Sequence, residues 1–300
     1  DILRLWVASS NFNEDLKISF ENLERLSESY RKIRNTLRFI LGNLNNWEKK
    51  EYVNEKELPP LERFIRNKLY TTNTQVIKHF EEYNFHKAFQ VILNFCSQTL
   101  SAFFFDIRKD CLYCDSVSST KRRSCRTVLF DILGCIITWL SPILPFTTEE
   151  VWQNWRKDID NDAVLSCHLL KFISPSISWK DDNIEKEWKL IFELRELFLV
   201  LMEKNRKVYD FKSSLDAEVD IYIKDIKCFK ILEKIELSEI LIVSKANLIF
   251  KNGNNSNEKN IEIIIKKIEG TKCPRCWKKF HMQKEQKICF RCQEVVNANN

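Results

Sequence analysis

Apolar residues recur at intervals of three and four over most of the first 210 residues. Between Ser19 and Trp47 these positions are Leu23, Leu26, Tyr30, Ile33, Leu37, Ile40, Leu41 and Leu44. Such spacing places them along one face of an α-helix, with polar residues on the other face. Amphipathic helices are stable when their apolar faces pack together, so we expect a mainly α-helical protein whose largest part is a helical bundle.

Capping and breaking residues divide this region into separate helices. Ser19 is expected to cap the first helix, and Gly42 with the Asn-rich residues after it to end that helix. Further helices are expected over about 60–83, 85–105, 118–140 and 185–208. Short connections between long helices are typical of a bundle.

Two prolines and a threonine lie at the boundary between the fourth and fifth helices. Pro142 and Pro145 cannot continue the helix that reaches Leu140. Thr147 is followed three residues later by Glu150, which is the spacing of a capping box. The sequence therefore predicts that the fifth helix starts at Thr147.

The pattern changes after residue 208. Residues 216–223 alternate between apolar and polar, and 240–243 and 261–268 are short runs rich in β-branched residues, so a strand is expected in each of these three segments. Residues 228–235 have the pattern of a short helix, and the Asn-rich 252–260 that of a loop. A small α/β unit is therefore expected after the bundle.

The composition is that of a globular protein and argues against a membrane span. With 44% hydrophobic and 30% charged residues among 300, the chain can bury a core. Its net charge of +6 favours anionic partners only mildly, because 42 acidic residues are interleaved with 48 basic ones. The longest uninterrupted apolar runs, such as Val91 to Leu93 and Leu197 to Met202, are far shorter than the roughly 20 residues of a membrane span. We therefore expect no membrane association.

The eleven cysteines argue against a disulfide framework. Seven of them are scattered, mostly in apolar segments, and the total is odd. Reduced thiols in a cytoplasmic protein fit this distribution better than disulfides in a secreted one.

The other four cysteines form two pairs with metal-ligand spacing. Two residues separate Cys273 from Cys276 and Cys289 from Cys292, and twelve residues lie between the pairs. Each pair can hold one side of a tetrahedral ion, and four thiolates typically bind a single structural Zn²⁺ with no open position. Since so short a segment cannot bury a core, the metal is expected to provide most of its folding free energy.

Other interpretations of these cysteines are four unrelated reduced thiols or the ligands of an iron–sulfur cluster. Zinc is favoured because no redox-partner motif accompanies them. His281 lies between the pairs and could replace a sulfur, but the simplest assignment leaves it at the surface.

Basic and aromatic residues surround the cysteines. They are Arg275, Trp277, Lys278, Lys279, Phe280, Lys284, Lys287, Phe290 and Arg291. Cationic side chains neutralise phosphates and flat rings stack on unpaired bases, so this combination suggests a surface for single-stranded RNA. Alternatively, Trp277 and Phe290 only cover the metal site; for Trp277 we favour the RNA contact.

Two more basic groups occur in the predicted helices. They are Arg31, Arg34 and Arg38, and then Lys121, Arg122, Arg123 and Arg126. Either group alone is more often a solvated helix face, but both together with a basic cysteine module favour RNA. Cys111 and Cys114 have the spacing of a metal-ligand pair, but without a second pair nearby they are interpreted as a chance pair in a loop. No residues are predicted to be catalytic.

Eight stretches resemble, in order, the C-terminal part of bacterial isoleucyl-tRNA synthetases. They are DILRLWVASS, YRKIRNTLRFILGNLN, YNFHKAFQVILNFCS, SAFFFDIRKD, SSTKRRSCRTVLFDIL, SPILPFTTEEVW, and CPRCW with CFRC. RKIRNT and SPILPFTTEEVW alone indicate only the class I synthetases for branched aliphatic amino acids and methionine. The cysteine motif after an α/β unit narrows the resemblance to the isoleucine enzymes.

The resemblance implies the tRNA-recognition part of a ligase that attaches isoleucine to its tRNA with ATP. The family's HIGH and KMSKS motifs and its editing domain are not found in these residues, so we expect no isoleucine activation by this chain alone; ATP–pyrophosphate exchange would contradict that. It also implies that the four cysteines are zinc ligands and that Trp277 matches the tryptophan after the second ligand. Arg34, Asn35 and Arg38 lie in the matching helix, near where the family's bundle meets tRNA.

The implied organisation has four parts. Residues 1–18 connect from a catalytic domain, 19–180 form the helical anticodon-binding bundle, 181–270 a small α/β junction domain, and 271–300 the zinc-binding module. The implied partners are isoleucine tRNA and the catalytic half of the same protein, in a cytoplasmic monomer. The alternatives are a free-standing zinc-ribbon protein that binds RNA or DNA, and a structural helical adaptor whose zinc module binds protein.

Overall fold

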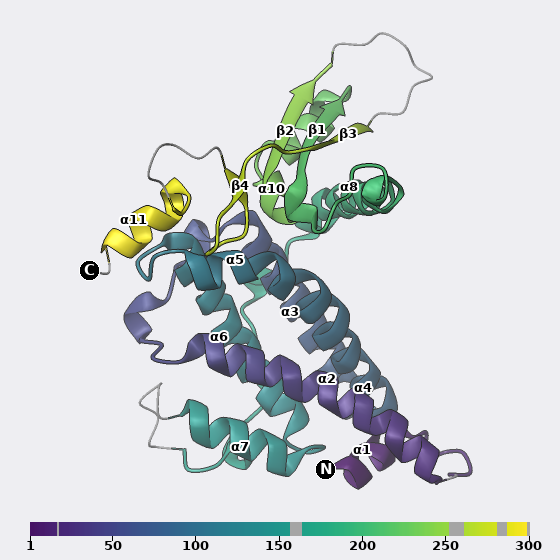
Figure 1. Cartoon of the computed structure of the whole chain (residues 1–300). Helices are drawn as coiled ribbons and strands as arrows, with labels where there is room; N and C mark the ends of the chain where they lie inside the picture. The colour runs from purple at the N-terminus through teal and green to yellow at the C-terminus, as the bar shows by residue number, and fades with distance from the viewer. Residues whose placement is uncertain (17, 157–163, 252–260, 281–286, 299–300) are drawn as a thin grey trace. The chain divides into compact units, whose positions relative to one another are not determined.

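The computed structural model describes residues 1–16, 18–156, 164–251, 261–280 and 287–298 (Figure 1). These residues form two compact units. Unit 1 contains Asp1–Asp106 and Val117–Asp181, and unit 2 contains Ile107–Ser116 and Asp182–Asn300. Predictions for the loop at 252–260, His281 and Lys284 lie outside the described residues. The division into four functional parts stays a prediction.

Unit 1 is helical throughout its described part, which confirms the predicted bundle. Its long helices are α1 (Ile2–Ser9), α2 (Phe20–Leu44), α3 (Pro60–Glu81), α4 (Phe85–Asn94), the π-helix η3 (Phe95–Phe105), α6 (Thr120–Leu140) and α7 (Pro145–Trp155). Single 3₁₀ turns are η1 (Lys49–Glu51), η2 (Glu55–Glu57), η4 (Cys167–Leu169) and η5 (Ile177–Trp179). Helix α2 packs against α1, α6, α7 and η3, so it is central to the bundle.

The core of unit 1 follows the predicted apolar periodicity. On α2, Ile33, Leu37 and Ile40 are at most 1% exposed. Trp139 of α6 is fully buried, and its indole N–H donates to Asn73 Oδ1 at 2.8 Å. Burying one such apolar side chain contributes about 1.5–3 kcal/mol, and pairing the indole N–H avoids the cost of an unsatisfied donor.

Of two helix starts predicted from capping residues, one is confirmed and one is wrong. The Ser19 side chain accepts a hydrogen bond from Asn22 N–H, so the predicted cap of α2 is confirmed. The predicted start at Thr147 is wrong, because α7 begins at Pro145. Proline at the first helical position has its φ already set for a helix, and its missing N–H is not needed there. The Thr147 hydroxyl instead contacts Asp1 and Tyr30.

The continuous helical stretch Phe85–Cys114 is long and apolar enough to cross a membrane, judged by length and composition alone. Counting uninterrupted apolar runs missed it, because a helical window tolerates a few polar residues. Half of its most apolar window is buried inside the protein, and core helices of soluble proteins pass the same test. It is therefore weak evidence for a membrane span.

Unit 2 contains the other helices and all described strands. Its helices are α5 (Asp106–Cys114, of which Ile107 onward belongs to unit 2), α8 (Asp182–Arg206), α9 (Ile226–Leu232), α10 (Leu237–Ile240) and α11 (Phe290–Ala298), with one 3₁₀ turn, η6 (Ser214–Asp216). Its strands are β1 (Ala217–Ile223), β2 (Lys245–Phe250), β3 (Ile261–Lys267), β4 (Thr271–Lys272) and β5 (Lys279–Phe280).

The larger sheet of unit 2 has the strand order β2-β1-β3. Strand β1 runs parallel to β2 and antiparallel to β3, with Val219 opposite Ala246 and Ile265. The parallel connection passes through α9 and α10, as parallel neighbours require a crossover. The prediction of a strand at 240–243 is wrong, because Ile240 ends α10 and the strand starts at Lys245. Short apolar runs fit buried helices as well as strands.

Candidate metal centre and RNA-binding surface

The four cysteines of the two predicted pairs lie together in unit 2. Their Sγ atoms are all within 4.8 Å of one another, and those of Cys276 and Cys289 are 3.6 Å apart. Four sulfurs bound tetrahedrally at about 2.3 Å lie about 3.8 Å from each other. The donor set and its spacing therefore fit one metal ion, which confirms a four-cysteine cluster able to hold it.

A short hairpin positions the first pair of cysteines. Strand β4 pairs with β5, and Cys273 comes directly after β4. The Cys273 N–H donates to the Lys278 carbonyl and the Trp277 N–H to the Cys273 carbonyl, both at 2.9 Å. Trp277 closes this turn with φ of 66°, in the left-handed region that few L-residues adopt. Of the second pair, Cys289 precedes α11 and Cys292 lies in its first turn.

Backbone groups around Cys273 favour its thiolate form. Burial raises the pKa of Cys273, but hydrogen bonds from the N–H groups of Cys276, Cys289 and Arg275 bring it down to about 6. Burial also raises the pKa of the Cys276 and Cys289 thiols. Thiolates are the form that binds metal ions, so the backbone N–H groups around Cys273 favour metal binding.

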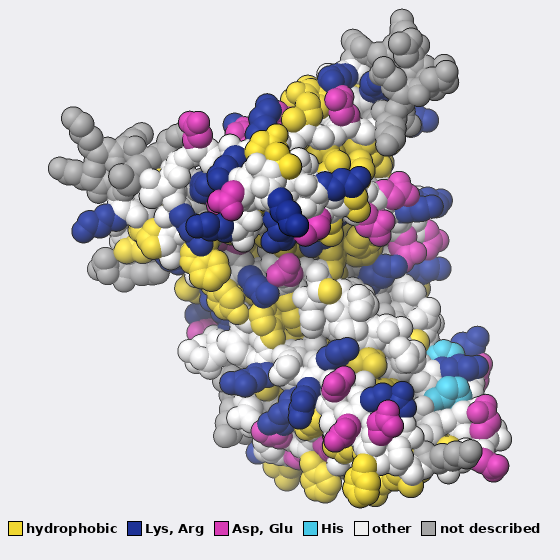
Figure 2. All heavy atoms as spheres, turned by 45° about the vertical axis from the view of Figure 1, so that its right-hand side comes forward, with side chains coloured by type: hydrophobic (Ala, Val, Ile, Leu, Met, Phe, Trp, Pro, Cys, Tyr) yellow, Lys and Arg dark blue, Asp and Glu magenta, His cyan; other side chains and the backbone are white. Residues whose placement is uncertain are grey.

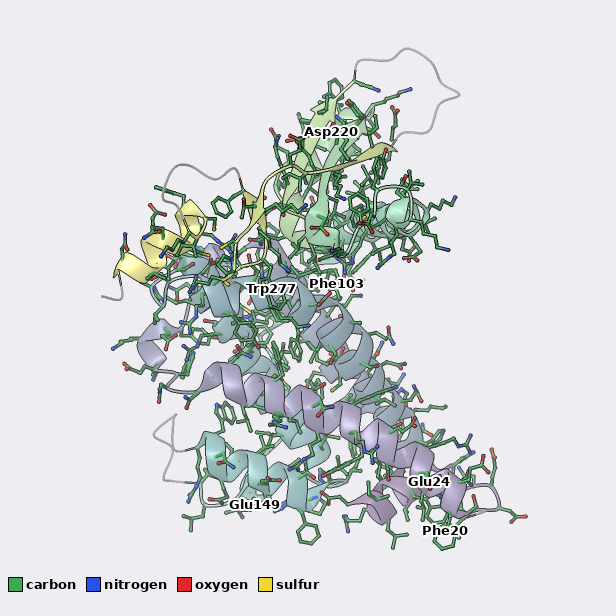
Figure 3. The ribbon with its side chains drawn as sticks, in the orientation of Figure 1. Phe20, Glu24, Phe103, Glu149, Asp220 and Trp277 are labelled. Carbon is green, nitrogen blue, oxygen red and sulfur yellow. The ribbon has the colours of Figure 1, made fainter. Side chains whose placement is uncertain are left out.

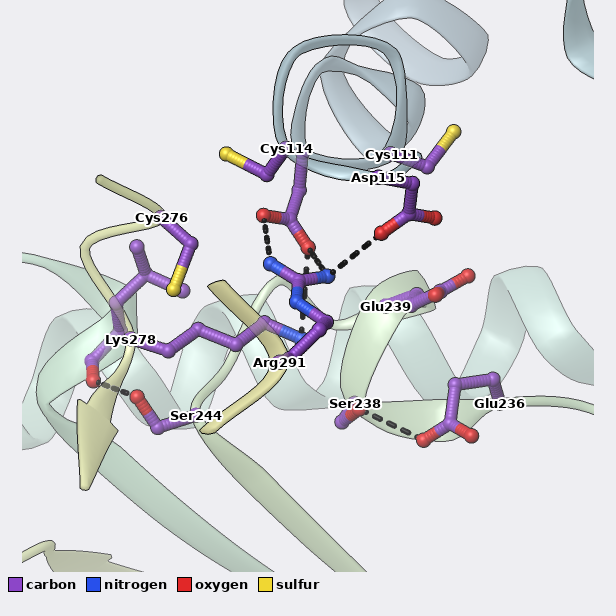
Figure 4. Close-up of polar contacts among 12 residues, drawn as sticks. Cys111, Cys114, Asp115, Glu236, Ser238, Glu239, Ser244, Cys276, Lys278 and Arg291 are labelled. Atoms are coloured by element: carbon purple, nitrogen blue, oxygen red, sulfur yellow. Dashed lines mark hydrogen bonds and ion pairs between the residues drawn. The ribbon is translucent and has the colours of Figure 1, made fainter. Parts of the chain in front are cut away.

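Arg291 connects the cysteine module, defined here as residues 271–298, to helix α5 of the same unit. Its guanidinium donates to both carboxylate oxygens of Asp110 at 2.7 Å and to Asp115 at 3.3 Å (Figure 4). The Asp110 hydrogen bond is the largest cause of a raised pKa for Arg291. Lys278 Nζ lies 3.7 Å from Asp110. Two side chains predicted to bind RNA therefore already have carboxylate partners.

Arg275 and Lys279 also have partners within unit 2. The Arg275 guanidinium donates to the carbonyl oxygens of Cys114 and Tyr113 and lies 3.6 Å from Cys292 Sγ. Lys279 Nζ is 3.4 Å from the Asp216 carboxylate. Both side chains hold the module in place, and their binding to RNA stays a prediction.

Trp277 has a different environment from these cations. Its side chain is 60% exposed, and Lys272 Nζ lies 5.0 Å from the centre of its ring, within cation–π distance (Figure 3). Phe290, at the start of α11, is 71% exposed. The cysteine module thus presents two flat rings and an ammonium group to solvent, which are the groups that stack on bases and neutralise phosphates.

In unit 1, Arg34 and Arg38 lie on the exposed face of α2. They line a cavity of about 250 Å³ with Glu150 and Asn154 of α7. Arg34 Nη1 is 2.9 Å from Glu150 Oε2, and both side chains are about half exposed. An exposed pair of this kind contributes little to stability, so Arg34 can exchange its partner at low cost.

The basic group on α6 is less exposed than its composition suggested. Arg123 donates to the backbone carbonyls of Lys50 and Glu51, and Arg122 is half-buried. Arg126 is 4% exposed and lies 3.3 Å from Glu51. On the face drawn in Figure 2, basic and acidic side chains are interspersed, as the composition predicts.

The placement of Cys111 and Cys114 in a loop is wrong. Both are buried on α5, and Cys114 packs against the four-cysteine cluster. Asp110 and Asp115, which bind Arg291, and Lys272, which lies beside Trp277, were not predicted from the sequence. Asp110 and Asp115 flank Cys111 and Cys114 in the sequence, and this arrangement alone predicts no function. Nothing in the sequence links these residues to Arg291, some 180 positions later.

Comparison with known proteins identifies the family. A family model described as the anticodon-binding domain of tRNA ligase matches residues 62–221, just over half of the chain. The chain belongs to this family. Isoleucine–tRNA ligase of Pelagibacter ubique is 42% identical over 283 residues, which cover 93% of this chain and 30% of that protein. The ligases of Natranaerobius thermophilus and Gluconobacter oxydans are each 36% identical, over 100% and 99% of this chain.

This member of the anticodon-binding family spans about a third of the length of the curated relatives it matches. The resemblance to isoleucyl-tRNA synthetases is confirmed, and it extends beyond the family model to the cysteine module. The alternative of a free-standing zinc-ribbon protein is not favoured, because the ligases match over nearly the whole chain.

Proposed function

We propose that this chain is the tRNA-recognition portion of an isoleucine–tRNA ligase. The observation that carries the proposal is the match to isoleucine–tRNA ligases along nearly the whole chain. The complete enzyme attaches isoleucine to its tRNA with ATP, in the part of its length that the match does not cover. It works in the cytoplasm, where translation takes place, and as a monomer.

The ion held by Cys273, Cys276, Cys289 and Cys292 is Zn²⁺ in this proposal. Four sulfur donors and no open position are typical of structural zinc sites. When bound, the ion fixes the turn that carries Trp277. Among the described residues of the module, those that are buried are mainly the cysteines themselves, so few apolar contacts help to determine its conformation.

Trp277 is the proposed contact of the module with the anticodon loop. Its exposed ring can stack on an unpaired base, and Lys272 can approach the neighbouring phosphate. Phe290 offers a second ring. Arg275, Lys278, Lys279 and Arg291 support this surface through their contacts within unit 2, and contribute positive charge to it.

The bundle contributes contacts to the phosphate backbone of the tRNA. Arg34 and Arg38 are the proposed groups on α2, and Arg122 and Arg123 those on α6. Phosphate contacts position a nucleic acid, while base contacts provide specificity. The bundle is therefore expected to affect binding of every tRNA, and Trp277 to distinguish the anticodon.

The test is binding of the zinc-loaded chain to isoleucine tRNA and to the same tRNA with a changed anticodon, at two salt concentrations. Trp277→Ala is expected to weaken binding of isoleucine tRNA about tenfold, because stacking of one base on an aromatic ring contributes about 1–3 kcal/mol. The unaltered chain should bind the tRNA with the changed anticodon more weakly than isoleucine tRNA. Trp277→Ala should reduce that weaker binding by a smaller factor. Cys273→Ser should have at least the effect of Trp277→Ala.

Tyr83→Ala is the matched control, since Tyr83 is another exposed aromatic, 67% exposed, and lies in unit 1. It should bind both tRNAs as the unaltered chain does. Equal, salt-insensitive binding of both tRNAs, unchanged by Trp277→Ala, would contradict the proposal and favour a structural adaptor whose zinc module binds protein.

A further inference from the structure

A second group of potential metal ligands lies in unit 1, at the end of the bundle that carries α7 (Figure 3). Glu149 is on α7, and Cys167 and His168 are in η4. One ligand atom from each residue lies within 4.8 Å of the other two. Among the residues that the structure describes, only the four-cysteine cluster brings potential ligands together in the same way.

Hydrogen bonds hold η4 against the Glu149 carboxylate. Glu149 Oε2 accepts from the Ser166 hydroxyl at 2.8 Å and from the Cys167 N–H at 3.0 Å. The Ser166 hydroxyl in turn accepts from the His168 N–H, which caps the start of η4. The backbone that carries Cys167 and His168 is therefore fixed beside the carboxylate, and a metal ion would not have to order it.

Glu149 and His168 each have a property that a metal ligand needs. Glu149 is anionic at neutral pH: partial burial raises its pKa, but hydrogen bonds from Gln153, Ser166 and Cys167 bring the pKa down to about 2. His168 is exposed, which gives an ion access from solvent.

Cys167 differs from the buried cysteines of the apolar core. Its sulfur is 3.3 Å from the Ser141 hydroxyl and 3.6 Å from the Thr148 hydroxyl. Burial raises the pKa of both Cys167 and the fully buried Cys96, but at Cys167 the hydrogen bonds with Ser141 and Thr148 partly offset this shift. Polar groups behind a ligand atom orient it and stabilise its metal-bound form, as outer-shell groups of known metal sites do.

We propose that Glu149, Cys167 and His168 bind a second Zn²⁺. A carboxylate, a thiolate and an imidazole together suit zinc, whereas magnesium and calcium prefer oxygen ligands alone. Three protein ligands leave a fourth position for a water molecule. The ion links η4 to α7 and so cross-links the two ends of the segment between residues 149 and 167.

The test counts zinc ions on the complete 300-residue chain by native mass spectrometry, during a titration with a chelator. The unaltered chain is expected to carry two ions, one of which is removed first, since three ligands and a water hold an ion less firmly than four thiolates. Cys167→Ser and His168→Ala should each carry a single ion. With Co²⁺ in place of zinc, Cys167→Ser should also lose part of the sulfur-to-cobalt charge-transfer absorption.

Cys228→Ser and His79→Ala are the matched controls and should keep both ions, because these residues lie outside both clusters. His168→Ala removes only an exposed side chain, so it tests the site even if Cys167→Ser fails to fold. A single zinc on the unaltered chain, retained in His168→Ala and lost in Cys273→Ser, would overturn the proposal and leave Glu149 as a cap of η4 alone. That outcome would not affect the proposed tRNA binding.

Discussion

At the scale of single residues, the buried charged side chains of unit 1 depend on their partners, because a buried charge without a counter-charge is destabilising. Arg66 and Asp131 are 3% and 8% exposed, and two nitrogens of the guanidinium lie 2.8 and 2.6 Å from Asp131 Oδ2. Burial raises the pKa of Asp131 to about 6, although Arg66 opposes this shift. The carboxyl is therefore ionised at neutral pH and paired with Arg66.

We expect Asp131→Ala to lower the free energy of unfolding by about 3–5 kcal/mol, because it leaves the Arg66 guanidinium buried without a counter-charge. Urea unfolding followed by circular dichroism measures this. The comparison is Glu150→Ala, which removes the exposed partner of Arg34 and should cost less than about 1 kcal/mol. Similar small losses for both variants would show that Arg66 finds solvent or another partner.

At the scale of elements, the sequence predicted the helices better than the contacts between distant elements. Periodicity gave α2, α3 and α6 nearly to their ends, because a helix buries one face and that face is visible in one segment. The parallel pairing of β1 with β2 depends on contacts between distant segments and has no local signal. The four-cysteine cluster was predictable because the cysteines obey a fixed spacing, whereas its attachment to α5 through Arg291 and Asp110 was not.

The attachment of the cysteine module to α5 can be measured with a double-mutant cycle on Arg291→Ala and Asp110→Ala. Both side chains are partly exposed, at 34% and 24%, so we expect a coupling of about 1–2 kcal/mol, between the values of exposed and buried pairs. The control cycle uses Lys234 and Glu187, a more exposed pair in the same unit, whose coupling should be about 0.5 kcal/mol or less. Coupling no larger than this control would mean that other contacts hold the module.

At the scale of the whole molecule, the two units differ in what stabilises them. Unit 1 has a large apolar core that includes Phe64, Phe104 and Trp139. In the cysteine module of unit 2, the buried residues in its described part are Cys273, Cys276, Cys292 and Val295. So few apolar contacts cannot offset the conformational entropy of about 1–2 kcal/mol for each ordered residue. If the four cysteines bind the proposed Zn²⁺, that ion contributes most of the module's stability.

Removal of the metal should therefore unfold the module and leave the bundle intact. With an excess of chelator, we expect amide hydrogen exchange in residues 271–298 to become fast, while α2, α3 and α6 keep their protection, because exchange reports local stability. Added Zn²⁺ should restore the protection, and Cys273→Ser should exchange rapidly even with zinc present. If the protection of α6 and that of the module were lost together, the two units would unfold cooperatively and the metal would stabilise the entire chain. If neither changed, the contacts of Arg275 and Arg291 with α5 would be sufficient to fold the module without a metal ion.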